Sequence, residues 1–125
     1  MIRILRPNSE DEQNVLIGMI VSDRYLAEVK TMLRPAMFNT PFGKTVSSWC
    51  FDYYRQYEKA PKETIQDLYQ SYTRTVEEDD PNIKLIGQFL DTLSKKHSNE
   101  KSFNVEYHLD TAQRFAKRRS LEMLK

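Results

Sequence analysis

The chain has 125 residues, a formal net charge of +1 and a single cysteine, Cys50. This length suits one domain, and the near-zero charge provides no overall attraction to DNA or to an anionic membrane. One cysteine excludes an internal disulfide, and the sequence contains neither a signal-peptide core nor an apolar run near the roughly 18 residues of a membrane span. We therefore expect a cytoplasmic protein without membrane contact.

Glycine and proline are scarce, with three and five residues, which disfavours a turn-rich β architecture and predicts an all-α fold. After an N-terminal extension (1–9), apolar residues at helical spacing predict a first helix over about 10–21 and a second over about 23–33. Pro35 ends the second helix, because proline disfavours helical conformation in the residue before it. One domain is expected over 10–125.

The third helix is expected over about 41–59. Thr40 can act as its N-cap, and Pro41 suits its first position, where the missing N–H costs nothing. A fourth helix is expected over about 63–73. These four helices form a small helical head, residues 10–75.

Aromatic residues crowd the third helix. Its main stripe consists of Phe42, Val46, Trp49, Tyr53 and Tyr57. Phe51 and Tyr54 lie off this stripe, so the helix is apolar over more than half its circumference, as in a helix surrounded by others. The alternative is a base-stacking platform, which requires rings beside cations that follow phosphates. Arg55 and Lys59 do not interleave with the stripe, which favours a core role for the rings.

The last two helices are expected over about 81–96 and from about Phe103 to the last residue. Each carries one narrow apolar row of the coiled-coil type, formed by Ile83, Ile86, Leu90 and Leu93 and by Val105, Leu109, Ala112 and Ala116. A short turn separates the two rows. The pattern predicts a C-terminal antiparallel helical hairpin, residues 81–125, joined along these rows.

The aromatic rings of Phe89, Tyr107 and Phe115 lie beside these two apolar rows. We expect the rings to be partly exposed and to be covered by a binding partner. The predicted oligomer or partner interface comprises Phe89, Leu93, Tyr107 and Phe115, with Arg114, Lys117 and Arg118 near its rim. Two alternatives stay open. The rings could pack on the first four helices, and the basic cluster, which continues to Arg119, could complement the helix C-terminus and acidic neighbours rather than touch phosphate.

The tetrapeptide "FGKT" (42–45) imitates the end of a phosphate-binding loop. That motif requires a glycine five residues before Gly43, where Phe38 stands, and a preceding strand. We expect no nucleotide binding at this tetrapeptide.

The histidines, the cysteine and the acidic cluster lack the neighbouring residues that a metal site or a catalytic site requires. His97 and His108 have no Cys or acidic residue at ligand spacing, Cys50 lies within the aromatic helix, and the acidic run 77–80 is typical of a solvated loop. The sequence predicts no catalytic residue, no cofactor site and no metal site.

The order of these segments resembles the N-terminal domain of DnaB-type hexameric replicative DNA helicases, in particular the shorter phage versions. The similar stretches are "DEQNVLIGMIVSDRYLAEV", "LRPAMFNTPFGKTVSSWCFDYYRQYEKAPKETIQDLY" and "IGQFLDTLSKKHSNEKSFNVEYHLDTAQRFAKRRSLEML". Asn104, His108, Arg118 and Arg119 approximate the family's closing pattern. The chain departs from the family where Ile17 precedes Gly18 and where Lys62 follows the turn proline.

This resemblance implies a head plus a hairpin whose pairing makes homodimers, which assemble as a trimer of dimers and recruit primase. A helicase loader is a further partner, and DNA is contacted only indirectly. The ATP- and Mg-dependent motor of that family lies C-terminal and is absent here, so the chain alone is expected not to be an enzyme. It ends within an expected helix at "SLEMLK", as a domain cut from a longer protein would, and a natural short product could end in the same way.

The expected function is therefore non-catalytic oligomerisation and primase interaction in DNA replication. The alternative is a free-standing phage or plasmid accessory protein, such as a helicase loader or a primase-binding adaptor. A small DNA-binding regulator that uses residues 114–119 is disfavoured by the near-zero net charge.

Overall fold

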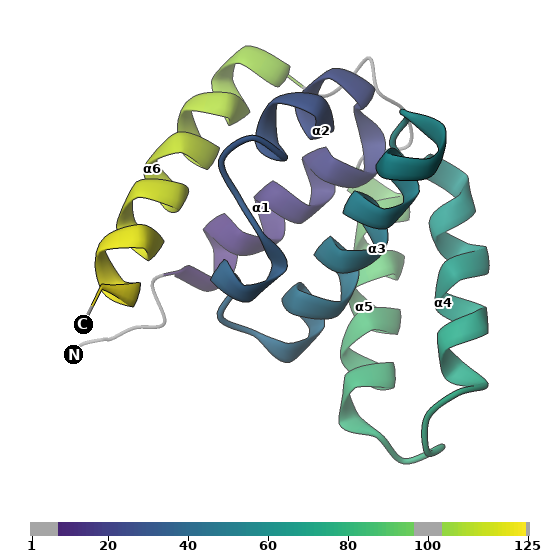
Figure 1. The fold of residues 1–125 in the computed structure, drawn as a ribbon. Coiled ribbons are helices and arrows are strands. Elements are labelled where there is room, and N and C mark those ends of the chain that lie inside the picture. The colour runs from purple at the N-terminus through teal and green to yellow at the C-terminus, as the bar shows by residue number, and fades with distance from the viewer. Residues whose placement is uncertain (1–7, 97–103, 125) are drawn as a thin grey trace.

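The structure, a computed structural model, describes residues 8–96 and 104–124, which contain no β-strand (Figure 1). The all-α expectation is confirmed. The α-helices are α1 (Asn8–Val21), α2 (Asp23–Val29), α3 (Pro41–Tyr57), α4 (Ile65–Thr73), α5 (Pro81–Lys96) and α6 (Val105–Met123), and short 3-10 helices, η1 (Pro35–Met37) and η2 (Lys62–Thr64), precede α3 and α4.

Helix α1 is the surrounded helix of the domain. Every residue from Val15 to Ser22 is buried, and α2, α3 and α6 all pack against α1 (Figure 1). We expected the aromatic helix, α3, to hold this central place. Helix α1 holds it because its second half carries apolar residues on all sides, as a fully enclosed helix requires.

Helix α2 ends at Val29, four residues before the expected Leu33. Its N-cap is Ser22, whose Oγ accepts a hydrogen bond from the Tyr25 amide at 3.1 Å. The chain then tightens, since the Thr31 amide donates to the Glu28 carbonyl three residues back instead of continuing the four-residue pattern. After this turn Arg34, the residue before Pro35, has the extended backbone conformation that a following proline favours.

Helix α3 begins as expected, with the Thr40 side chain accepting a hydrogen bond from the Gly43 amide at 3.0 Å. Its buried line runs through Phe42, Val46 and Cys50, with exposed fractions of 9%, 0% and 0%. The aromatic stripe follows this line only at the start of the helix and then turns outward, so that Tyr57 is 54% exposed. The core interpretation therefore holds for the first half of the stripe.

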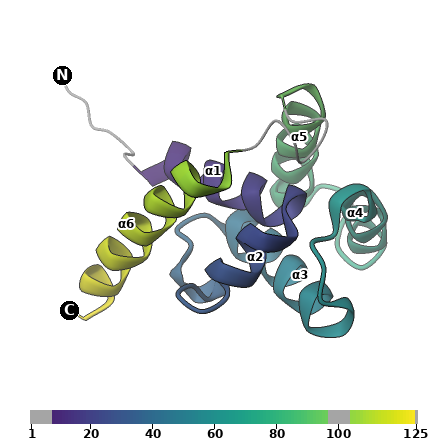
Figure 2. The same ribbon diagram turned by 90° about the horizontal axis from the view of Figure 1, so that it is seen from above.

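Helices α5 and α6 do not pair as the expected hairpin. Helix α5 packs on α3 and α4, whereas α6 packs on α1 and α2, and two perpendicular views place them beside these different partners (Figures 1 and 2). The apolar row of each helix packs against the head. One common core contains Ile86 and Leu90 of α5 together with Ala112 and Ala116 of α6. The hairpin prediction is corrected accordingly, and its turn lies largely outside the described residues.

Candidate partner-binding surface on α6

Three of the predicted interface residues lie in the core. Phe89, Leu93 and Phe115 are 5%, 6% and 0% exposed. The Phe89 ring packs on Phe42 and the Phe115 ring on Phe38, with centroids 5.7 Å apart in both pairs. The expectation of partly exposed rings is wrong for Phe89 and Phe115, and the alternative, that they pack on the first four helices, holds for them.

The basic cluster of α6 is divided between two sides of the helix. Arg118 forms an ion pair with Asp11 of α1 at 3.2 Å, and Arg119 donates a hydrogen bond from Nε to the Met37 carbonyl at 2.5 Å. These two side chains attach α6 to the rest of the domain. This confirms the interpretation that part of the cluster complements an acidic neighbour.

Six exposed residues follow one line along the opposite side of α6. Steps of three, four, three, four and three residues place them on a single side of the helix. We call this line the outer face of α6; it consists of Tyr107, Asp110, Arg114, Lys117, Leu121 and Leu124. Tyr107, Leu121 and Leu124 are 62%, 59% and 81% exposed.

The outer face contains three predicted residues and three that the sequence analysis did not identify, Asp110, Leu121 and Leu124. Tyr107, Arg114 and Lys117 belong to it, as expected of interface residues. Leu121 and Leu124 were not singled out, although the same helical spacing continues through them. Of the three aromatic rings predicted at the interface, Phe89 and Phe115 are buried and only Tyr107 is exposed.

The charged residues of the outer face indicate which kind of partner this face can bind. Apolar side chains lie at both ends, and Asp110, Arg114 and Lys117 lie between them. If two copies paired antiparallel along this face, Arg114 would face Lys117, and if they paired parallel each cation would face its own copy. Like charges placed opposite each other oppose association. A partner helix with apolar ends and a carboxylate-rich middle is therefore the better complement.

The N-terminus of α3, which carries the "FGKT" tetrapeptide, is occupied by the protein itself. The carboxylate of Glu12 accepts hydrogen bonds from the amides of Asn39 and Thr40 at 2.8 and 3.1 Å. Lys44 donates from Nζ to the Phe38 carbonyl. A helix N-terminus attracts anions, and here the Glu12 side chain is that anion.

The other reactive side chains that the structure describes form no site. Cys50 is fully buried, and burial raises the pKa of its thiol, which keeps it protonated and unreactive. The His108 ring stacks edge-on against Tyr107 with centroids 5.1 Å apart, and His97 lies outside the described residues. Within residues 8–96 and 104–124, no group of three His, Cys, Asp or Glu residues is placed to hold a metal ion, and no helix has the length and apolarity to cross a membrane.

Comparison of the chain with protein-family models, with curated proteins and with solved structures finds no match.

Proposed function

We propose that this chain is a non-catalytic protein-interaction domain that acts in DNA replication, with the outer face of α6 as its contact surface. The observation that carries the proposal is where large hydrophobic side chains stay exposed. Of the six such side chains in the described residues, four lie on α6 or at its C-cap: Tyr107, Leu121, Met123 and Leu124. Apolar groups gathered on one helix favour a protein partner.

The resemblance to DnaB-type helicase N-terminal domains supports the replication context. It implies primase as a partner, self-assembly within a hexamer, a helicase loader as a further partner, a cytoplasmic location and an ATPase motor elsewhere in a full-length protein. The arrangement of α5 and α6 changes one part of this picture. The family's pairing through a hairpin is not transferred to these helices, because their apolar rows are buried in the head.

The charge pattern of the outer face favours the alternative, a replication adaptor that binds a different protein. Self-pairing along this face would bring Arg114 of one copy near Lys117 of another, whereas an acidic amphipathic helix of a second protein would neutralise both. As a primase-binding adaptor or a helicase loader, the chain would use the outer face of α6 to hold its partner.

Matched leucine substitutions test the proposed surface. Leu121→Glu changes the outer face, and Leu85→Glu makes the same change on α5 at a side chain that is also exposed, 44% against 59%. We expect both variants to keep the helical circular dichroism signal. Leu121→Glu should weaken binding to purified primase from the same source, measured by calorimetry, by at least tenfold, while Leu85→Glu binds as the unchanged protein does.

Sedimentation equilibrium of the same proteins without primase measures self-association. Equal primase affinity in Leu121→Glu and Leu85→Glu, or no primase binding by the unchanged chain, would contradict the proposal. Self-association that Leu121→Glu abolishes would favour the helicase-domain interpretation over the adaptor.

A further inference from the structure

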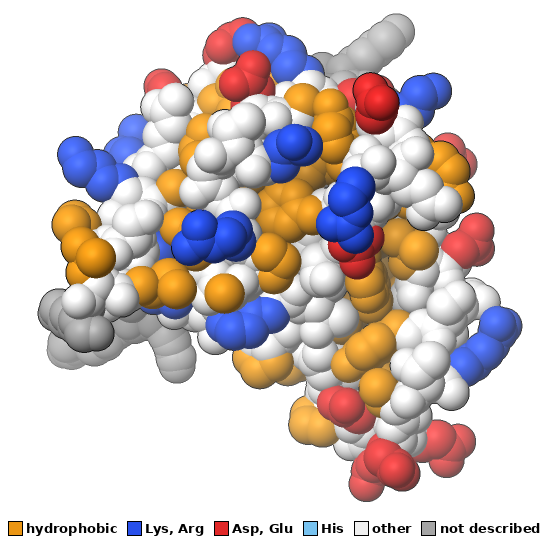
Figure 3. All heavy atoms as spheres, viewed as in Figure 1, with side chains coloured by type: hydrophobic (Ala, Val, Ile, Leu, Met, Phe, Trp, Pro, Cys, Tyr) orange, Lys and Arg blue, Asp and Glu red, His pale blue; other side chains and the backbone are white. Residues whose placement is uncertain are grey.

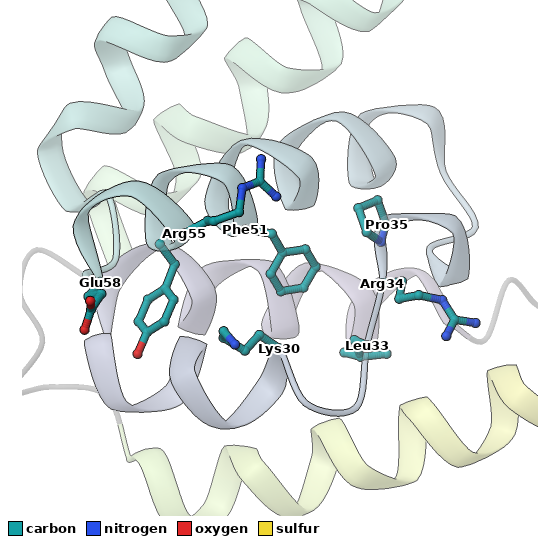
Figure 4. Close-up of a pocket in the computed structure, with 8 residues that line it drawn as sticks. Lys30, Leu33, Arg34, Pro35, Phe51, Arg55 and Glu58 are labelled. Atoms are coloured by element: carbon teal, nitrogen blue, oxygen red, sulfur yellow. The ribbon is translucent and has the colours of Figure 1, made fainter.

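A groove lies between the chain that follows α2 and the second half of α3. It has a volume of about 520 Å³. The side chains that give it chemical character are Lys30, Arg34, Phe51, Tyr54, Arg55 and Glu58. Figure 4 shows the Phe51 ring reaching from α3 toward the turn after α2, with Lys30 and Arg34 on either side of it.

The groove combines aromatic rings with cations. Phe51 and Tyr54 are three residues apart on α3 and both are half-buried, so each ring is held by the fold and keeps exposed surface. The Nζ atom of Lys30 lies 5.6 Å from the centroid of the Tyr54 ring. No sequence pattern predicts this proximity, since the lysine and the ring are 24 positions apart and come together only in the fold.

The cations of the groove are not neutralised by strong ion pairs among the described residues. Lys30 and Arg34 are exposed, and among the described residues no carboxylate pairs with either. Arg55 contacts Asp52 at 2.7 Å, but the Arg55 side chain is 77% exposed, where such a pair is weak. Three cations against the Glu58 carboxylate in the lining leave an excess of positive charge.

The helix dipoles account for two of the three cations, Lys30 and Arg55, and leave Arg34 without such an explanation. A cation near the end of α2 would complement its carbonyl groups, and Lys30, the C-cap, has that position. Arg55 lies in the last turn of α3 and has the same position relative to the carbonyl groups of that helix. Arg34 follows four residues after Lys30 in extended chain, beyond the reach of either helix end. On the face drawn in Figure 3, Lys and Arg side chains lie around hydrophobic ones over α2 and α3, with acidic side chains next to a central cation, at the top and near the turn between α4 and α5.

The geometry points to a binding site for single-stranded nucleic acid in this groove, with a base against the Phe51 and Tyr54 rings and the neighbouring phosphates at Arg34, Lys30 and Arg55. Proteins that bind single strands without sequence preference combine these two features, a basic track and aromatic side chains on which bases stack. An acidic peptide would use the cations and leave the rings without a role. The site is independent of the outer face of α6 and goes beyond the proposed function, in which DNA is contacted only indirectly.

The test uses the whole chain and fluorescein-labelled oligothymidylate, with fluorescence anisotropy at low ionic strength as the measurement. Arg34→Glu changes the groove, and Arg74→Glu makes the identical change at an exposed arginine at the end of α4, outside both proposed sites. Arg34→Glu should weaken binding at least tenfold and Arg74→Glu less than twofold. For each phosphate that a variant no longer neutralises, the slope of log affinity against log salt should also become shallower by about 0.7.

A second pair of variants tests the ring. Tyr54→Leu removes an aromatic ring of the groove, and Tyr57→Leu removes an exposed ring one turn later on α3. Stacking of one base contributes about 1–3 kcal/mol, so Tyr54→Leu should weaken binding about fivefold or more and Tyr57→Leu should not. Equal losses in Arg34→Glu and Arg74→Glu, no binding of the oligonucleotide, or equal affinity for polyglutamate would each overturn the proposal.

Discussion

The carboxylate of Glu12 holds Thr40 by two hydrogen bonds across 28 positions of sequence. Its Oε1 atom accepts from the Thr40 hydroxyl at 2.5 Å and from the Thr40 amide at 3.1 Å. The same hydroxyl accepts from the Gly43 amide, so one threonine links a side chain of the central helix to the first turn of α3. Glu12 is 1% exposed, and this contact therefore fixes where α3 begins relative to α1.

Removing one charge from this contact should destabilise the domain. Glu12→Gln keeps the shape of the side chain but replaces one acceptor oxygen with a donor group that faces N–H donors. We expect the free energy of unfolding in urea to fall by about 1–3 kcal/mol, the cost of leaving buried hydrogen-bonding groups unsatisfied. Glu28→Gln, at an exposed residue of α2, is the matched control and should change stability by less than about 0.5 kcal/mol.

Gly43→Ala should destabilise the domain although alanine is the better helix former by about 1 kcal/mol. A Cβ atom at Gly43 would overlap Oε1 of Glu12 and lie 2.7 Å from Oγ1 of Thr40. In a Glu12→Ala background most of this overlap disappears, and the cost of Gly43→Ala should shrink. A double-mutant cycle in urea measures the difference, and additive effects would show that the contact does not constrain Gly43.

Stability should fall as the solution becomes alkaline because of Cys50. Burial raises the pKa of this thiol in the folded protein, while in the unfolded chain a cysteine has a pKa of about 8.5. Above that pH the unfolded chain loses a proton that the folded protein keeps, so unfolding becomes more favourable. The decrease in stability should reach about 1.4 kcal/mol one pH unit above the unfolded pKa.

Cys50→Ala isolates this contribution. Burial also raises the pKa of Tyr25, which Cys50→Ala leaves in place, so the difference between the two proteins reports the thiol alone. Urea unfolding at about pH 7.5 and about pH 9.5 should show the stability gap between them shift by about 1.4 kcal/mol in favour of Cys50→Ala. A gap that is the same at both pH values would mean that the thiol titrates alike in the folded and unfolded protein.

Local signals in the sequence predicted the helices well. Thr40 with Pro41, and Asp80 with Pro81, mark helix starts that depend only on neighbouring residues, and α3 and α5 begin at these prolines. The end of α2 was predicted too late, because the prediction relied on Pro35 and the helix already ends before the turn at Thr31. Which rows of apolar residues face each other depends on the whole fold, and the pairing of α5 with α6 was wrong for that reason.

The two candidate sites also differ in how far the sequence predicts them. The sequence predicted Tyr107 as a ring beside the apolar row and Arg114 and Lys117 as members of a basic cluster, and helical spacing joins them to Leu121 and Leu124 in the outer face of α6. The sequence does not indicate the groove, because Arg34 lies 21 positions from Arg55 and the two line one groove only after the turn behind α2 has formed. Proximity between distant segments of this kind leaves no periodic signal in a single sequence.

Substituting Phe115 and Tyr107 should separate a core residue from a surface residue on the same helix. Phe115 is 0% exposed and its ring packs on Phe38, so Phe115→Ala leaves a cavity and should lower the free energy of unfolding by about 3–5 kcal/mol. Tyr107, two turns earlier, is 62% exposed, and Tyr107→Ala should stay within about 0.5 kcal/mol of the unchanged protein. Urea unfolding followed by circular dichroism measures both. If Phe115→Ala instead left the unfolding curve unchanged and only dissociated a dimer, Phe115 would lie at an interface, and the packing of α6 on the head would have to be abandoned.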